Sequence, residues 1–80
     1  MAVRIRILGP GCPKCRKMAE LANRAVAELG IQAEVEEVHD IAEIARYAMI
    51  TPAMVVDEKL VMEGLKPYPT ILETLKRLAG

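Results

Sequence analysis

Apolar and polar residues alternate at the start of the chain and then change to helical spacing. The alternation over residues 2–8 predicts a strand with one well-buried face. That face carries Val3, Ile5 and Ile7, and the other carries Arg4, Arg6 and Leu8. Residues 9–11 form a loop. From Met18 the apolar residues follow the i, i+3, i+4, i+7 spacing of an amphipathic helix, which Gly30 ends: Met18, Leu21, Ala22, Ala25, Val26 and Leu29.

Residues 31–38 form a second predicted strand, with Ala33 and Val35 on one face. A strand, a helix and a strand in this order imply two parallel strands joined by a right-handed crossover. On the more polar face, Arg4 and Arg6 are then expected to lie beside Glu34 and Glu36.

The second half of the chain predicts a short helix, a hairpin and a last helix. Asp40 and Glu43 have the spacing of a capping box. The short helix is expected to continue through Met49, with four residues facing inward: Ile41, Ile44, Ala45 and Ala48. Residues 53–57 and 60–63 are predicted strands, joined by a tight turn at Asp57, Glu58 and Lys59. The last helix would bury Ile71, Leu72, Leu75 and Leu78, and we expect Met49, Met54 and Met62 to fill the core.

The predicted order is β-α-β-α-β-β-α, which indicates the α/β class. We expect residues 1–80 to form a single domain, with a four-stranded mixed sheet flanked by three helices. The chain contains no Phe and no Trp, so aliphatic side chains must fill the core.

Charge and hydropathy exclude several functions. Eleven basic residues balance eleven acidic ones, which argues against nucleic acid or an anionic membrane as the main partner. No apolar run is long enough to span a bilayer. The first residues alternate instead of forming the apolar core of a signal peptide, so we expect a cytoplasmic protein.

The two cysteines of the chain lie three residues apart, in Cys12-Pro13-Lys14-Cys15. A bridge between them closes a very short loop and would stabilise the fold little. Their place at a predicted helix start favours reactivity, because unpaired backbone N–H groups and the helix dipole stabilise a thiolate there. Three-residue helical spacing also brings the two sulfurs onto one face. The pair therefore points to redox or metal chemistry.

Cations follow the first cysteine in an unusual place. Pro13 suits the first helical position, where its missing N–H is not needed. Lys14, Arg16 and Lys17 then occupy the first turn, where cations oppose the helix dipole. A Cys12 thiolate would offset that cost, and we expect this role for Lys14. For Arg16 and Lys17, simple solvation at the surface is an equal alternative.

Thr51-Pro52 stands directly before the third predicted strand, where a proline is compatible with sheet structure. Together with Cys-x-x-Cys after the first strand and the element order, it makes nearly the whole chain resemble the thioredoxin fold. The chain is most similar to the small thioredoxin/glutaredoxin-like, redox-active disulfide proteins. The resemblance implies that Cys12 is the nucleophile and Cys15 the resolving thiol, with Pro52 a cis-proline beside them. It also implies that the Thr51 backbone pairs with a substrate chain.

The expected function is therefore thiol–disulfide exchange: a protein disulfide reductase that cycles through a Cys12–Cys15 disulfide and needs no other cofactor. Its partners would be disulfide-containing proteins and an unidentified reductase or thiol donor, and we expect a monomer. The chain departs from the thioredoxin pattern in three places. Gly11 stands in place of a tryptophan, Pro13-Lys14 in place of Gly-Pro, and Arg6 in place of a buried acid.

The motif of the chain also resembles that of glutaredoxins. Cys-Pro-Lys-Cys is close to the glutaredoxin Cys-Pro-Tyr-Cys. Glu63-Gly64-Leu65, however, does not supply their Gly-Gly-Asp glutathione-binding segment. The electron donor is therefore open.

Two other functions use the same residues. Heavy-metal-associated domains also carry Cys-x-x-Cys after a first strand, but they run β-α-β-β-α-β and typically place Met-Thr before the first cysteine. Two thiolates would leave a tetrahedral metal site half filled, so zinc or an iron–sulfur cluster would be shared by two chains. A thioredoxin-like module that only docks partners is the third alternative, and it would not need Cys12.

Overall fold

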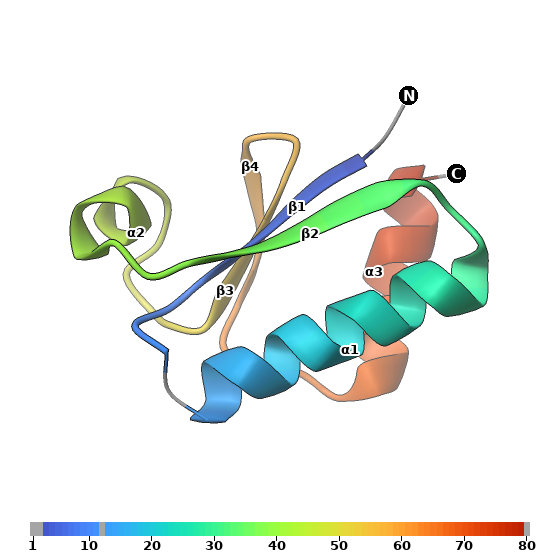
Figure 1. Ribbon diagram of the computed structural model, residues 1–80, viewed down its shortest axis with the longest axis horizontal. Coiled ribbons are helices and arrows are strands. Elements are labelled where there is room, and N and C mark those ends of the chain that lie inside the picture. Colours follow the sequence, from blue (N-terminus) through green and yellow to red (C-terminus); the bar gives the residue numbers. More distant parts are fainter. Residues whose placement is uncertain (1–2, 12, 80) are drawn as a thin grey trace.

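The computed structural model describes residues 3–11 and 13–79, and the predicted element order is confirmed (Figure 1). The elements are β1 (Val3–Leu8), α1 (Pro13–Leu29), β2 (Ala33–Val38), α2 (Ile41–Tyr47), β3 (Ala53–Val56), β4 (Lys59–Glu63) and α3 (Tyr68–Ala79). Gly30 ends α1 with a φ of 65°, as a left-handed stop requires. No helix in the described ranges has both the length and the apolar character that crossing a bilayer demands.

The four strands form one mixed sheet in the order β2-β1-β3-β4. β1 pairs in parallel with β2, while the β1–β3 and β3–β4 pairs are antiparallel. The parallel pair follows from the long α1 crossover, and the β3–β4 pair follows from a two-residue turn. Asp57 and Glu58 both have positive φ in that turn, 48° and 70°, so Lys59, which we predicted to lie in the turn, belongs to β4.

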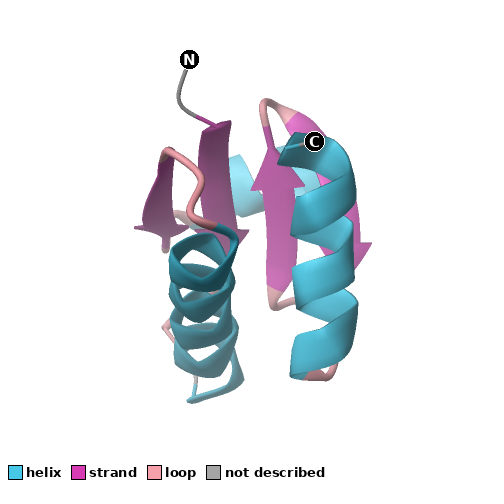
Figure 2. Ribbon diagram, turned by 90° about the vertical axis from the view of Figure 1, so that its right-hand side faces the viewer, coloured by secondary structure: helices cyan, strands magenta, loops and turns pink. Residues whose placement is uncertain are grey.

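Two helices cover one face of the sheet and a short one covers the other. Figure 2 shows α1 and α3 side by side, with α2 behind the sheet. The main core lies between the sheet and the α1–α3 layer, and the predicted apolar stripes face it. Its central buried side chains are Ile5, Ile7, Met18, Ala22, Met54, Ile71 and Leu75.

A second, smaller core lies under α2. Leu8 is fully buried there, although it belongs to the face of β1 that carries the two arginines. It packs with Val38, Ile44, Ala48, Ala53 and Val55. The carboxyl end of β1 is therefore apolar on both faces, which leaves little freedom for the loop that follows it.

The prediction for α2 was only partly correct. The Asp40 side chain accepts a hydrogen bond from the Ala42 N–H at 2.9 Å, so Asp40 does cap the helix. The Glu43 carboxylate approaches Arg6 and Arg46 instead of completing the capping box. Ile41 is 74% exposed, because so short a helix buries only a narrow stripe.

Further predictions on apolar side chains and element ends were wrong. Ala45 is exposed on the outer side of α2. α2 ends at Tyr47, so Met49 lies beyond it and is 97% exposed instead of filling the core. Leu78, in the last turn of α3, is about half exposed. The second strand begins at Ala33, two residues later than predicted.

α1 and α3 are also joined by polar side chains. The Tyr68 hydroxyl donates to Glu28 Oε1 at 3.0 Å, and the Arg24 guanidinium lies 4.1 Å from the centre of the Tyr68 ring. Desolvation of the phenol and the adjacent Glu28 carboxylate raise the pKa of Tyr68, and Arg24 lowers it by less. These contacts hold the start of α3 against the second half of α1.

The predicted pairing of arginine and glutamate side chains is confirmed for Arg6. In the parallel register Arg4 lies opposite Glu34 and Arg6 opposite Glu36. Arg6 Nε lies 3.3 Å from Glu36 Oε1, and the guanidinium also lies 5.8 Å from the centre of the Tyr47 ring. Arg6 thus faces α2, on the side of the sheet opposite α1.

We expect Arg6→Glu to lower the free energy of unfolding by about 1 kcal/mol, because it places like charges side by side across two strands. Adding Glu36→Arg should restore part of that loss. The rescue remains partial because Glu43 and Tyr47 also contact Arg6. Urea unfolding of the two single variants and the double variant measures this coupling, and strictly additive losses would contradict it.

Candidate functional site

Three segments meet at one end of the sheet: the end of β1, the start of α1 and the start of β3 (Figure 1). Leu8, the last residue of β1, pairs with Ala53, the first of β3. The Gly9 N–H donates to the Val38 carbonyl at 3.0 Å and so extends the parallel ladder by one residue. This pairing fixes the loop that leads into α1 beside the residues that precede β3.

α1 begins at Pro13, so the predicted first helical position is confirmed. Lys14 and Arg16 are exposed on the first turn, which contains no acidic residue. Cys12 lies outside the described residues. Its position in the chain, directly before the first residue of α1, is the place that the sequence indicated for a nucleophile.

Cys15 lies in the first turn of α1 and is 2% exposed. Its side chain packs directly against Gly9. A Cβ atom built on Gly9 would overlap the Cys15 sulfur and would lie 2.9 Å from Cys15 Cβ. Only a residue without a side chain fits at position 9 while Cys15 keeps this place.

Pro52 also lies near Gly9, on the same side as Cys15. The Thr51–Pro52 peptide bond is cis, as the resemblance implied, and Pro52 is buried while Thr51 is exposed. The Cβ position of Gly9 is 4.0 Å from Pro52 Cα. The structure therefore brings Cys15 and Pro52 together around Gly9, a residue that sequence reasoning assigned only to a loop.

A second residue that sequence reasoning missed is Glu63, the last residue of β4. Its carboxylate accepts hydrogen bonds from the backbone of Met49 and Ile50, just before Thr51. The adjacent Gly64 N–H donates to the Pro52 carbonyl at 2.6 Å. The end of β4 thus holds the segment that carries Thr51 and Pro52.

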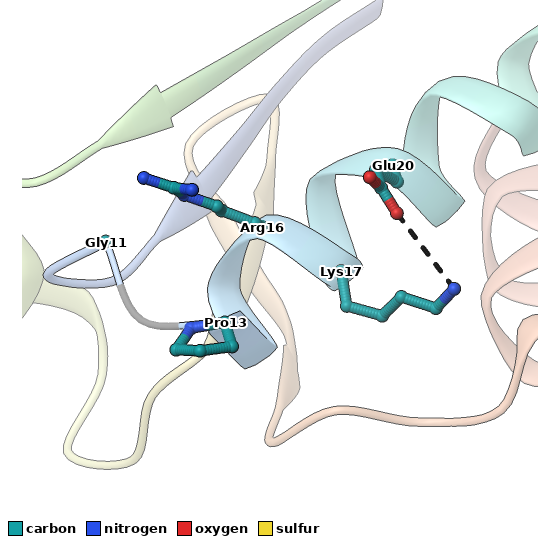
Figure 3. A pocket seen from close by; sticks show the side chains of 5 residues that line it. All are labelled: Gly11, Pro13, Arg16, Lys17 and Glu20. Atoms are coloured by element: carbon teal, nitrogen blue, oxygen red, sulfur yellow. Dashed lines mark ion pairs between the residues drawn. The ribbon is translucent and has the colours of Figure 1, made fainter.

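A shallow hollow of about 450 Å³ lies at the start of α1 and is lined by Gly11, Pro13, Arg16, Lys17 and Glu20. Figure 3 shows Arg16 and Lys17 pointing in opposite directions, Lys17 toward Glu20. Lys17 Nζ is 4.0 Å from Glu20 Oε2. Both cationic side chains are exposed, so water screens their repulsion from the helix dipole.

Comparison with known proteins agrees with this geometry. The sequence model of the thioredoxin domain matches residues 3–76. A thioredoxin of Methanocaldococcus jannaschii is 48% identical over 73 residues, which cover 90% of this chain and 85% of the relative. A thioredoxin of Methanothermobacter thermautotrophicus is 35% identical over 63 residues, covering 78% and 82% of the two chains.

The solution structure of the oxidised thioredoxin from Plasmodium falciparum is similar in fold. Its TM-score is 0.67 at 13% sequence identity, and the match covers 98% of this chain and 82% of the other. At that identity the match concerns the fold alone.

Proposed function

This chain belongs to the thioredoxin domain family, a family of thiol–disulfide oxidoreductases, and we propose that it reduces disulfide bonds in proteins through Cys12 and Cys15. One observation carries the proposal. A buried Cys15, three residues after Cys12, lies in the first turn of α1 against Gly9 and next to the cis Thr51–Pro52 bond.

The proposed reaction has two exchange steps. The Cys12 thiolate attacks one sulfur of the substrate disulfide, forms a mixed disulfide and releases the other substrate sulfur as a thiolate. Deprotonated Cys15 then attacks the Cys12 sulfur and releases the second substrate thiolate. Two electrons have passed to the substrate, and the chain holds a Cys12–Cys15 disulfide. An external thiol donor or reductase must reduce this bond before the next turnover.

The segment before β3 supplies the proposed binding surface for the substrate. Thr51 is exposed, while Pro52 is buried and its carbonyl accepts a hydrogen bond from the Gly64 N–H, so the backbone after Thr51 is held in place. We propose that an extended stretch of the substrate pairs with the Thr51 backbone as an added strand. This pairing would bring the substrate disulfide to the start of α1.

The oligomeric state, the compartment and the redox group of the chain belong to the proposal as well. We propose that the chain acts as a monomer in the cytoplasm, with the Cys12–Cys15 disulfide as its only redox group. Arg6, which stands where thioredoxins carry a buried acid, faces α2 and pairs with Glu36. Its side chain supplies no general base for Cys15.

The test is the reduction of insulin disulfides by the full chain with dithiothreitol as the electron donor. We expect catalysis well above the rate with dithiothreitol alone, together with a reversible Cys12–Cys15 disulfide. No catalysis, together with a Cys12 that does not titrate, would overturn the proposal. Metal analysis of anaerobically purified protein tests the alternative, in which zinc or iron would be present at a fixed ratio to the chain.

Lys14 provides a more specific test. It is exposed in the first turn of α1, adjacent to Cys15 and two residues after Cys12, where a cation stabilises the Cys12 thiolate. We expect Lys14→Gln to raise the pKa of Cys12, and only slightly, since solvent screens an exposed charge. The pH dependence of iodoacetamide alkylation measures this pKa. Lys66→Gln, an exposed change in the loop before α3, should leave it unaltered, and equal effects of the two variants would contradict a local role for Lys14.

A further inference from the structure

The Glu63 carboxylate makes two hydrogen bonds across the gap between β4 and the segment that precedes β3. Its Oε2 atom lies 3.1 Å from the Met49 nitrogen and 3.2 Å from the Ile50 nitrogen. Both N–H groups donate to the same charged oxygen. Hydrogen bonds to an ionised acceptor are stronger than those between neutral groups.

The segment that these bonds hold has little other support. α2 ends at Tyr47 and β3 begins at Ala53, so residues 48–52 belong to neither element. Ala48 and Pro52 are buried at the two ends. Between them Met49 is 97% exposed and Ile50 58% exposed, so packing holds neither side chain in place.

The residue next to Glu63 also holds this segment, by a hydrogen bond to Pro52. Gly64 follows Glu63 in the chain, and its N–H donates to the Pro52 carbonyl. Glu63 itself lies opposite Ala53 in the β3–β4 register. Two adjacent residues at the end of β4 therefore hold the segment on both sides of Thr51.

From this arrangement we infer that Glu63 is a positioning residue for protein substrates. Resting on the function proposed above, the inference is that the Glu63 carboxylate holds the Met49–Ile50 backbone, so that Thr51 presents its main chain to an extended substrate. Loss of the carboxylate would then weaken substrate binding without changing the chemistry of the two thiols. In this role Glu63 acts through the backbone alone.

Loss of the Glu63 carboxylate should slow the reduction of a protein disulfide but not that of a small one. In Glu63→Ala we expect the KM for insulin to rise about five-fold, as the loss of two charge-assisted hydrogen bonds warrants, with kcat within about two-fold of the wild type. The rate with 5,5′-dithiobis(2-nitrobenzoate), a small disulfide that needs no strand pairing, should stay unchanged. Glu63→Gln keeps an acceptor without the charge and should fall between Glu63→Ala and the wild type.

A control variant and a second readout separate positioning from general destabilisation. Glu73→Ala removes an exposed carboxylate from α3 and should change none of these rates. Hydrogen exchange at the Met49 and Ile50 amides should accelerate in Glu63→Ala, while exchange in the core of β3 stays as in the wild type. If the alanine variant does not fold, the kinetics and the hydrogen exchange are measured on Glu63→Gln instead.

The possible failures are distinct. A wild-type chain that reduces neither disulfide overturns the proposed function and, with it, the substrate role of Glu63. A wild-type chain that reduces both, with an unchanged insulin KM in the Glu63 variants, overturns the inference alone. An equal loss of rate toward insulin and the small disulfide also overturns it, because Glu63 would then affect the thiols themselves.

Discussion

Cys12→Ser should reduce the catalysed rate of insulin reduction by at least about 1000-fold, because a serine hydroxyl cannot replace the thiolate as nucleophile at neutral pH. Cys15→Ser should lose turnover for a different reason. Its Cys12 still attacks the substrate, but no second thiolate resolves the mixed disulfide. The two variants therefore separate the two steps of the reaction.

The measurement is mass spectrometry of the chain after the reduced chain has been incubated with insulin in the absence of free thiol. Cys15→Ser should accumulate a covalent adduct with insulin, and added dithiothreitol should release it. Cys12→Ser should form no such adduct, because buried Cys15 cannot reach a protein disulfide. Retained activity in Cys12→Ser would favour the module that only docks partners. Adduct formation through Cys15 would reverse the roles of the two cysteines.

The sequence predicted the order of elements because each long element carries its own periodicity. The alternation at Ile5 and Ile7 and the spacing from Met18 onward both depend on one large core, and that core is the one observed. The placement of Pro13 at the start of α1 was also predictable from local chemistry, since a proline loses nothing at the first helical position.

The errors lie where tertiary context overrides the local pattern. Ile41 and Met49 were predicted to be buried from their apolar character, but α2 is too short to cover both. Leu8 was correctly placed opposite Ile5 and Ile7, yet the pattern did not show that α2 buries this second face as well. Which side chains a short element buries depends on the elements packed against it, and the local sequence pattern carries no information on that packing.

The two positioning contacts of the candidate site left no signal in the local pattern. Glu63 reaches Met49 and Ile50 across 14 and 13 residues, and nothing in the sequence around Glu63 marks it as an anchor. Gly9 looked like an ordinary loop glycine before a proline. Its role depends on Cys15, which only the packing of α1 against the end of β1 brings next to it.

Gly9→Ala should both destabilise the fold and slow the second chemical step. The added methyl group overlaps the buried Cys15 sulfur and approaches its Cβ to 2.9 Å. Overpacking of this kind costs about 1–3 kcal/mol. Alanine also restricts the unfolded chain, which favours the fold by only about 0.4–1 kcal/mol. The clash therefore outweighs this gain. Urea unfolding should show that the free energy of unfolding falls by about 1–2 kcal/mol.

The position of the sulfur makes the effect on turnover larger than the effect on stability. A shift of about 1 Å in a reacting atom can cost about 100-fold in rate, so resolution of the mixed disulfide by Cys15 should slow to a comparable extent. Attack by Cys12 does not depend on the Cys15 sulfur and should proceed. Gly9→Ala should consequently accumulate the insulin adduct during turnover, as Cys15→Ser does, but release it slowly.

A double-mutant cycle identifies the Cys15 sulfur as the cause. In a Cys15→Ala background the sulfur is absent, so Gly9→Ala should cost about 1 kcal/mol less than it does beside Cys15, the remainder reflecting the approach to Cβ. Equal costs in the two backgrounds would show that Gly9 constrains the backbone rather than Cys15. In that case the mixed disulfide should resolve at the wild-type rate, and the small residue at position 9 would serve the fold alone.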